Sequence, residues 1–360
     1  MKIKNLLTLI LTGAFVAGFS GAAYLKKPDE SSVSERRLLA QFPTVSPLDP
    51  TFSSKFDSYA TDQFPLRDIF RSIKASTAIG VLRQLDNHNV YIVDGSASEI
   101  DYPLSESKVS YAAGRVNYVI SSYVKGNSKA YFAVIPDKNA FLAKANGYPA
   151  YDFDDLKSLF ASEIQGAQEI EIADLLDISD FYRTDTHWSQ EKILPVAKKI
   201  AAAMGVELSA EYREVTLDTP FYGVYRGRSA LSLSPDRLTY LTNDFLDNLK
   251  VSDGETGREI PVYDLSLADG RDSYEMFLSG SKSLLTIGNP DAENDRSLVI
   301  IRDSFGSSLS PLLFEGWKKV TVVDIRYLMP EVLGRFIDFE NSDVLFIYSA
   351  SVLNNSETIK

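Results

Sequence analysis

Histidine is scarce in this chain, so few side chains could act as a base at neutral pH. The 360 residues include two histidines, His88 and His187. Asp185 stands two positions before His187, and in an extended segment such residues point to the same face. A carboxylate placed there can orient the imidazole ring. The segment 183–189, RTDTHWS, is therefore our first candidate for general base catalysis.

The other histidine, His88, is a weaker candidate for a catalytic role. His88 is flanked by Asn87 and Asn89 in a turn-like stretch, and Asp86 is its single neighbouring carboxylate at useful spacing. We interpret His88 as a residue that serves local hydrogen bonding.

A serine at a predicted strand-to-helix turn supplies a matching nucleophile. The apolar run 298–301 predicts a buried strand, and a helix is expected from Ser304 onward. Free N–H groups at a helix N-terminus can stabilise a developing oxyanion. We expect these donors at Ser304 and at Phe305 or Gly306, and we expect Gly306 to leave space for the substrate.

Taken alone, a serine at such a turn is usually a helix cap, and Asp303 could do the same work. Together with Asp185 and His187, however, Ser304 completes a catalytic triad. Ser304 would attack an acyl carbonyl, His187 would take its proton and later deliver it, and Asp185 would fix the imidazole tautomer.

A metal site is the alternative use of Asp185 and His187. The chain has no cysteine, and no second histidine stands at ligand spacing, so only carboxylates could complete such a site. We expect neither a metal nor a cofactor.

The arrangement of predicted elements indicates an α/β fold. Strands at 130–135, 298–301, 320–325 and 344–348 alternate with helices, which predicts a parallel sheet flanked by helices. The helices include 105–124, 189–204 with Ser189 as its N-cap, 304–317 and 327–337, and a short strand is expected at 169–172. The stretch 206–296 alternates in short runs and reads as a β-rich insertion.

Polar residues after two of these strands are weaker candidates for substrate binding. Lys138 and Asn139 follow the strand 130–135, and Arg326 and Tyr327 follow the strand that ends at 325. Ligand groups often lie at this edge of an open α/β sheet. A plain turn, a solvated arginine and a packed tyrosine are the simpler interpretations.

The N-terminus predicts export from the cytoplasm. Lys2 and Lys4 precede an apolar run from about Leu6 to Tyr24, so residues 1–26 form either a cleaved signal peptide or a membrane anchor. Residues 27–50 read as a linker, and 51–360 as the main domain. Its first part, 52–82, has helical periodicity with aromatic anchors, and Pro65 divides it into two helices.

Charge and cysteine content exclude other classes of partner and anchor. A formal net charge of −12 opposes nucleic-acid binding. Because the chain has no cysteine, it has neither a lipid-anchor site nor disulfides, and its stability must come from an apolar core.

Several segments of the chain, including those of the proposed triad, resemble a known family, the DHHW proteins. These are SGNH-hydrolase-like relatives of the alginate-type polysaccharide O-acetyltransferases. The matching segments are Asp62–Asp68, Pro136–Lys138, Asp185–Trp188, Phe221–Gly223, Arg302–Phe305 and Asp324–Tyr327. Thr186 replaces the first histidine of the name motif. The serine follows the Asp-x-His pair, as in the alginate-type relatives, whereas SGNH esterases begin with the serine.

The resemblance implies an extracytoplasmic O-acetyltransferase or acetylesterase that acts on a cell-surface or exported polysaccharide through an acyl-Ser304 intermediate. A transferase would receive acetyl groups from a multipass membrane partner. The competing hypothesis is a non-catalytic polysaccharide-binding or export-complex scaffold on the same fold. The two differ in whether Asp185, His187 and Ser304 meet at hydrogen-bond distance.

Overall fold

The computed structural model describes residues 3–32 and 34–360 of the chain. The chain divides into two compact units. The first unit holds the residues up to His88 together with 226–232, and the second holds 89–225 and 233–360. All the predicted site residues lie in the second unit.

An eight-stranded sheet forms the centre of the second unit, with the strand order β10-β9-β11-β13-β12-β14-β5-β6. The strands from β13 to β6 run parallel, and β11, β9 and β10 each pair antiparallel with a neighbour. The strands are β5 (Lys129–Ile135), β6 (Ala167–Glu169), β9 (Lys250–Asp253), β10 (Glu259–Pro261), β11 (Leu284–Gly288), β12 (Ser297–Arg302), β13 (Lys319–Val323) and β14 (Ser342–Ser349).

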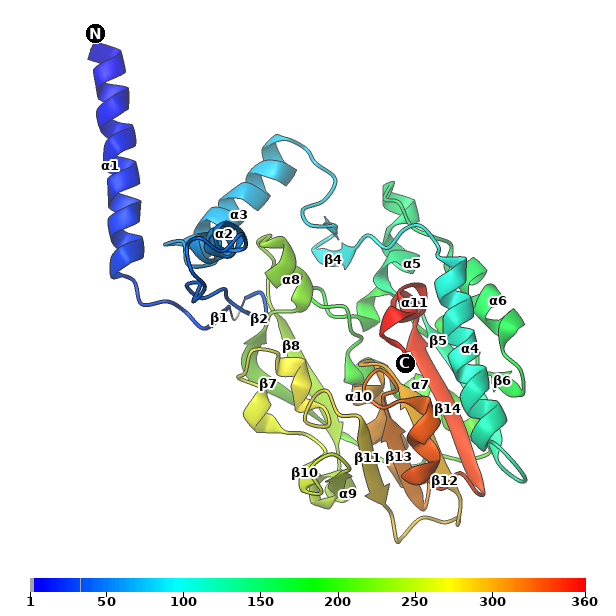
Figure 1. The fold of residues 1–360 in the computed structure, drawn as a ribbon. Coiled ribbons are helices and arrows are strands. Elements are labelled where there is room, and N and C mark those ends of the chain that lie inside the picture. The colour runs from blue at the N-terminus through cyan, green and yellow to red at the C-terminus, as the bar shows by residue number, and fades with distance from the viewer. Residues whose placement is uncertain (1–2, 33) are drawn as a thin grey trace. The chain divides into compact units, whose positions relative to one another are not determined.

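Helices cover both faces of this sheet, which explains why its central strands are apolar on both sides. One face packs against α4 (Glu106–Tyr123), α6 (Phe153–Glu163) and α11 (Ala350–Asn354), which lie beside β14 and β5 in Figure 1. The other face packs against α7 (Leu194–Ala203) and the 3₁₀ segment Ser310–Gly316. The predicted parallel α/β sheet flanked by helices is therefore confirmed.

The segment between residues 206 and 296 is β-rich, and it contributes to two different sheets. Its strands β7 (Arg213–Phe221) and β8 (Asp236–Thr242) form a separate antiparallel pair. Strands β9, β10 and β11 instead extend the central sheet. A further pair, β3 (Val90–Val93) and β4 (Ser96–Glu99), comes earlier in the chain. The short helices of the unit are α5 (Lys138–Leu142), α9 (Asp244–Asn248) and α10 (Gly306–Leu309), and α8 (Val224–Ser229) links the two units along the chain.

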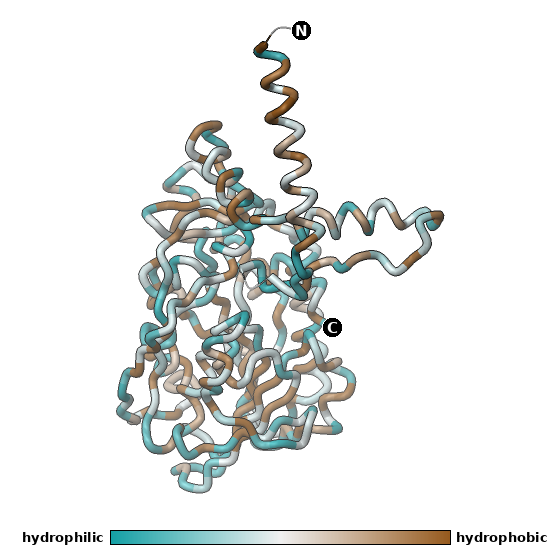
Figure 2. Tube along the Cα trace, turned by 90° about the vertical axis from the view of Figure 1, so that its left-hand side faces the viewer, coloured by the Kyte–Doolittle hydropathy of each residue, from teal (hydrophilic) through white to brown (hydrophobic). Residues whose placement is uncertain are grey.

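The first unit contains an apolar helix followed by a hairpin and two amphipathic helices. Helix α1 (Ile3–Leu25) has no buried residue, and its length and composition suffice to cross a membrane. In Figure 2 most of this helix has the colours of hydrophobic residues. Strands β1 (Ser31–Ser32) and β2 (Arg37–Leu38) form the hairpin, followed by α2 (Phe52–Asp62) and α3 (Arg67–Ser76), which continues as a π turn through Val81. The predicted break at Pro65 lies between α2 and α3.

Several helices are shorter than the periodicity predicts, and proline accounts for two of these differences. The helix expected from Ser189 begins at Leu194, because a 3₁₀ turn at Gln190–Lys192 precedes it and Pro195 occupies its first turn. Ser189 stands at the N-cap of this 3₁₀ turn, but its side chain makes no capping hydrogen bond, and the N-cap of α7 is Ile193. After Ser304, α10 gives way to the 3₁₀ segment that contains Pro311.

Two smaller differences concern one expected helix and one expected strand. The expected helix at 327–337 is a 3₁₀ segment, Pro330–Arg335. The strand expected at 169–172 lies slightly earlier, as β6.

Candidate active site

Three residues from two distant parts of the chain form a continuous chain of hydrogen bonds. His187 Nε2 lies 2.8 Å from Ser304 Oγ, and His187 Nδ1 lies 2.6 Å from Asp185 Oδ1. Asp185 is fully buried, His187 is 8% exposed and Ser304 is half-buried. The structure therefore brings together the three residues proposed from the sequence, with only the serine partly open to solvent.

The hydrogen bonds of Asp185 determine which imidazole nitrogen carries the proton. Asp185 Oδ1 also accepts the backbone N–H of His187 at 3.1 Å, and Oδ2 accepts the N–H of Val224 at 2.8 Å. With the carboxylate fixed in this way, its bond to Nδ1 places the proton on Nδ1. Nε2 is then left with its lone pair directed at the Ser304 hydroxyl, which is the arrangement a general base requires.

A buried carboxylate outside the predicted set holds the loop before Asp185. Asp236, at the start of β8, accepts the backbone N–H groups of Arg183 at 2.9 Å and Thr184 at 2.8 Å. It also accepts the Thr184 hydroxyl at 2.6 Å. Sequence reasoning missed Asp236, because nothing in its local pattern distinguishes it from a surface aspartate at a strand end.

The predicted binding candidate Lys138 instead lies under this loop. It is 1% exposed, and its Nζ donates to the carbonyl oxygens of Tyr182 at 2.7 Å and of Arg183 and Asp185, both at 3.2 Å. Burial lowers the pKa of Lys138 to about 7, against the opposing effect of the Asp185 and Asp236 charges. Lys138 therefore supports the backbone that carries the triad acid.

Asn139 is also buried and also serves the framework. Its Oδ1 accepts the hydroxyl of Tyr91 at 2.8 Å, and its Nδ2 donates to the carbonyl of Glu99 at 2.5 Å. These contacts tie the start of α5 to β3 and β4.

Gly223 lies tightly against the backbone of the loop that carries Asp185. A Cβ atom at this position would lie 2.3 Å from the carbonyl carbon and oxygen of Thr184 and 2.4 Å from Asp185 Cα. The Gly223 N–H donates to Thr184 Oγ1 at 2.8 Å. This contact gives a physical reason for the Phe221–Gly223 segment of the family resemblance, since any side chain at residue 223 would displace the loop.

Two aromatic rings enclose the imidazole. Tyr274 stacks on His187 with 3.8 Å between ring centroids and 9° between planes, and Phe305 lies at 4.9 Å. The Tyr274 hydroxyl donates to Ser308 Oγ at 2.9 Å, and Trp188 Nε1 reaches the same oxygen at 3.0 Å. Tyr274 and Ser308 were not predicted, because they come from the insertion and from the interior of the turn after Ser304.

The turn that presents Ser304 is capped by Asp303. Asp303 Oδ1 accepts the Phe305 N–H at 3.0 Å, and the Asp303 carbonyl accepts the Gly306 N–H at 3.1 Å. Phe305 and Gly306 were the alternatives for the second oxyanion donor, and the N–H groups of both therefore already have partners within the turn. Among the described residues, the N–H of Ser304 itself makes no such bond.

Gly306 is needed for packing beneath the turn. A Cβ there would lie 2.5 Å from Arg302 Cβ. Arg302 is 1% exposed, and its Nη1 contacts the buried Asp324 at 3.5 Å. Glycine at 306 thus admits the buried arginine beneath the turn.

The remaining two candidates lie after β13. Arg326 binds Asp324 through two nitrogens, with Nε 2.9 Å from Oδ1 and Nη2 2.7 Å from Oδ2. Tyr327 is half exposed, and the Arg326 guanidinium lies 5.7 Å from its ring centroid. Arg326 is engaged in an internal ion pair, so Tyr327 is the more open of the two.

No group of three or more potential metal ligands occurs among residues 3–32 and 34–360.

The family model of the DHHW proteins matches residues 175–323. The match includes Asp185, His187, Trp188 and Ser304, and it confirms the family resemblance drawn from these residues. A search of curated proteins found no significant match.

Solved structures share the fold at low sequence identity. A DHHW family protein from Eubacterium siraeum is 19% identical, with a TM-score of 0.62 over 76% of this chain and 95% of the other. PatB1 of Bacillus cereus is 17% identical, with a TM-score of 0.60 over 75% of this chain and 98% of the other. A second structure of PatB1 carries a sulfonyl adduct and gives 18% identity and a TM-score of 0.58 over 73% of this chain and 97% of the other.

Proposed function

We propose that this protein is an extracytoplasmic O-acetyltransferase or acetylesterase that modifies a cell-surface or exported polysaccharide. The single observation that carries the proposal is the chain of hydrogen bonds from Ser304 through His187 to Asp185. A non-catalytic scaffold has no need for a hydroxyl, an imidazole of fixed tautomer and a buried carboxylate aligned in this way. The exposed apolar helix α1 supports action outside the cytoplasm.

The proposed reaction proceeds through an acyl-enzyme. Ser304 Oγ attacks the carbonyl carbon of an acetyl ester while His187 Nε2 takes its proton, and Asp185 stabilises the imidazolium that forms. The C–O bond to the leaving alcohol then breaks as His187 returns the proton to that alcohol. The acetyl-Ser304 ester is then attacked by a sugar hydroxyl or by water, which loses its proton to His187. The bond between the acetyl carbon and Ser304 Oγ finally breaks, and His187 returns the proton to Ser304.

The structure supports one oxyanion donor from the turn, the N–H of Ser304. A second donor would have to come from another part of the site, because Asp303 engages the N–H groups of Phe305 and Gly306. In a transferase, the acetyl group would come from a multipass membrane partner, as the family resemblance implies.

Active-site labelling tests this proposal directly. The full chain in detergent is treated with a fluorophosphonate or a sulfonyl fluoride, and acetate release from an activated acetyl ester is measured in parallel. We expect wild type to be labelled, Ser304→Ala to be unlabelled and His187→Ala to react far more slowly. His88→Ala is the matched control, since it removes the other histidine. Absence of both labelling and acetate release in wild type would overturn the catalytic proposal and favour the scaffold.

A further inference from the structure

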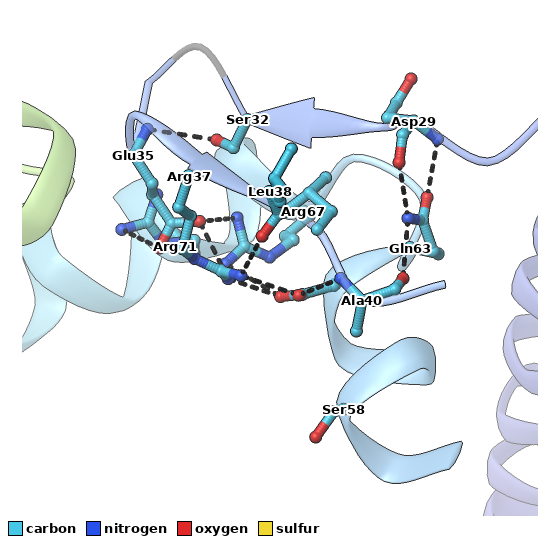
Figure 3. Close-up of polar contacts among 12 residues, drawn as sticks. Asp29, Ser32, Glu35, Arg37, Leu38, Ala40, Ser58, Gln63, Arg67 and Arg71 are labelled. Atoms are coloured by element: carbon cyan, nitrogen blue, oxygen red, sulfur yellow. Dashed lines mark hydrogen bonds and ion pairs between the residues drawn. The ribbon is translucent and has the colours of Figure 1, made fainter. Parts of the chain in front are cut away.

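Helix α3 turns its charged side toward the β1–β2 hairpin of the same unit. Arg67 Nη1 lies 2.6 Å from Glu35 Oε2, and Arg71 Nη2 lies 3.2 Å from Glu35 Oε1 (Figure 3). The Arg67 and Arg71 side chains are 14% and 18% exposed. The small residue Ala75 completes this inner side and is fully buried. The guanidinium groups therefore fix which side of α3 faces inward.

A second ion pair holds the hairpin that carries Glu35. Asp62 binds the Arg37 guanidinium with both oxygens, at 2.6 and 2.8 Å, and accepts the Ala40 N–H at 2.9 Å. The hydrogen bond from Arg37 lowers the pKa of Asp62 to about 2, despite the opposing effect of burial. Rotation of α3 about its axis would break the contacts that this network makes to Arg67 and Arg71.

The outer face of α3 is apolar. Leu66, Ile69, Phe70 and Ile73 are 60%, 54%, 37% and 56% exposed. Their spacing places them on one side of the helix, opposite the arginines. A surface helix normally buries such a stripe and exposes its charges, so the orientation here is inverted. A contiguous exposed apolar stripe of this kind marks an interaction surface.

The membrane-spanning candidate α1 lies against this stripe. The Phe19 ring is 5.3 Å from Phe64 and 5.6 Å from Phe70, measured between centroids. With 23 residues, α1 is about 34 Å long, which matches a bilayer core of about 30 Å. Phe19 stands about 9 Å before the end of α1 at Leu25. A bilayer spanned by α1 would therefore end close to the apolar face of α3.

We propose that α3 lies on the outer surface of the membrane that α1 spans, with Leu66, Ile69, Phe70 and Ile73 inserted at the boundary between headgroups and acyl chains. We assign the lipid bilayer to this face because the apolar stripe of α3 is continuous with the residues that contact the membrane-spanning candidate α1. Helix α3 and the spanning helix α1 together attach the chain to the membrane at two points, which is stronger than a single apolar contact. The proposal concerns the first unit alone and does not depend on the activity of Ser304.

The absence of cysteine makes the proposal testable with single labels. Ile69→Cys and Ile73→Cys are prepared in the full chain, with Ser58→Cys on α2 as the control at an exposed hydroxyl. Each is labelled with an environment-sensitive fluorophore and reconstituted in vesicles of phosphatidylcholine and phosphatidylglycerol. Quenching is measured with brominated acyl chains in the bilayer and with iodide in water. Both isoleucines are exposed, so the substitutions should leave the fold intact.

We expect brominated lipid to quench the labels at 69 and 73 by about half or more, with little effect of iodide. The label at 58 should show the reverse pattern. Quenching at 69 and 73 by iodide would show a face open to water and would overturn the proposal. Protection from both quenchers would also overturn it, because the face would then be covered by a protein partner or a second copy of the chain.

Discussion

Replacing Gly223 with alanine tests whether the triad depends on the close packing of two loops. The added Cβ would lie 2.3 Å from the Thr184 carbonyl and 2.4 Å from Asp185 Cα. Non-bonded carbon atoms normally approach to about 3.5 Å, so the loop must move by about 1 Å. Because Asp185 belongs to this loop, the shift reaches the bond between the carboxylate and His187. A misplacement of about 1 Å can lower a rate by ~10²-fold.

The measurement is the rate of fluorophosphonate labelling and of acetate release, with circular dichroism and thermal unfolding as checks on the fold. Gly114→Ala is the matched control, since a Cβ at Gly114 in α4 meets no atom within 4 Å. We expect Gly223→Ala to lose about two orders of magnitude in rate while Gly114→Ala stays near wild type. A folded Gly223→Ala protein that reacts within about twofold of wild type would refute the reasoning, because the loop would then tolerate the displacement.

Three further predictions concern the groups around the site and the hairpin. Tyr274→Phe keeps the ring on His187 and should lower the labelling rate by less than about tenfold, whereas Tyr274→Leu removes the stacking and should lower it further. Lys138 has a pKa of about 7 in the folded chain and about 10.4 in the unfolded chain. Between pH 7 and about 10.4 the unfolded chain therefore binds more protons at Lys138 than the folded chain does, so the free energy of unfolding rises with pH in this range. When urea unfolding is measured across this pH range, the free energy of unfolding of Lys138→Met should rise less with pH than that of wild type. Asp62→Asn should be less stable than wild type above about pH 4, and the two curves should converge as pH falls toward 2, where Asp62 takes up its proton; parallel curves throughout would contradict this.

The triad could be proposed from the sequence because its signals are local. An Asp-x-His pair in an extended loop and a serine after a buried strand are each visible within a few residues. The α/β alternation then places the ends of parallel strands at one edge of the sheet. Neither step requires knowledge of contacts between distant segments.

The supports of the triad could not be proposed in this way, because they depend on long-range packing. Asp236 is separated from Thr184 by 52 positions, and Tyr274 comes from yet another part of the insertion. Lys138 follows a sheet strand, a position that suits a ligand group equally well. Only its burial and its three carbonyl contacts distinguish a structural role from a binding role.

Helix α3 shows a different limit of sequence reasoning. Periodicity predicted a helix and its aromatic anchors, but it did not predict which face would be buried. The ion pairs of Glu35 with Arg67 and Arg71 decide that question, since they bury the charged face against the hairpin. The contact that fixes α3 therefore comes from a segment that composition alone marks as a linker.

The β-rich insertion contributes residues to the candidate active site, and this changes what its removal would do. Val224 and Asp236 hold the triad acid and its loop through backbone hydrogen bonds, and Tyr274 covers the imidazole. An insertion that only bound polysaccharide could be deleted with loss of substrate affinity and retention of serine reactivity. Here the same deletion would remove the groups that keep Asp185 in place, so reactivity toward a small fluorophosphonate should be lost as well.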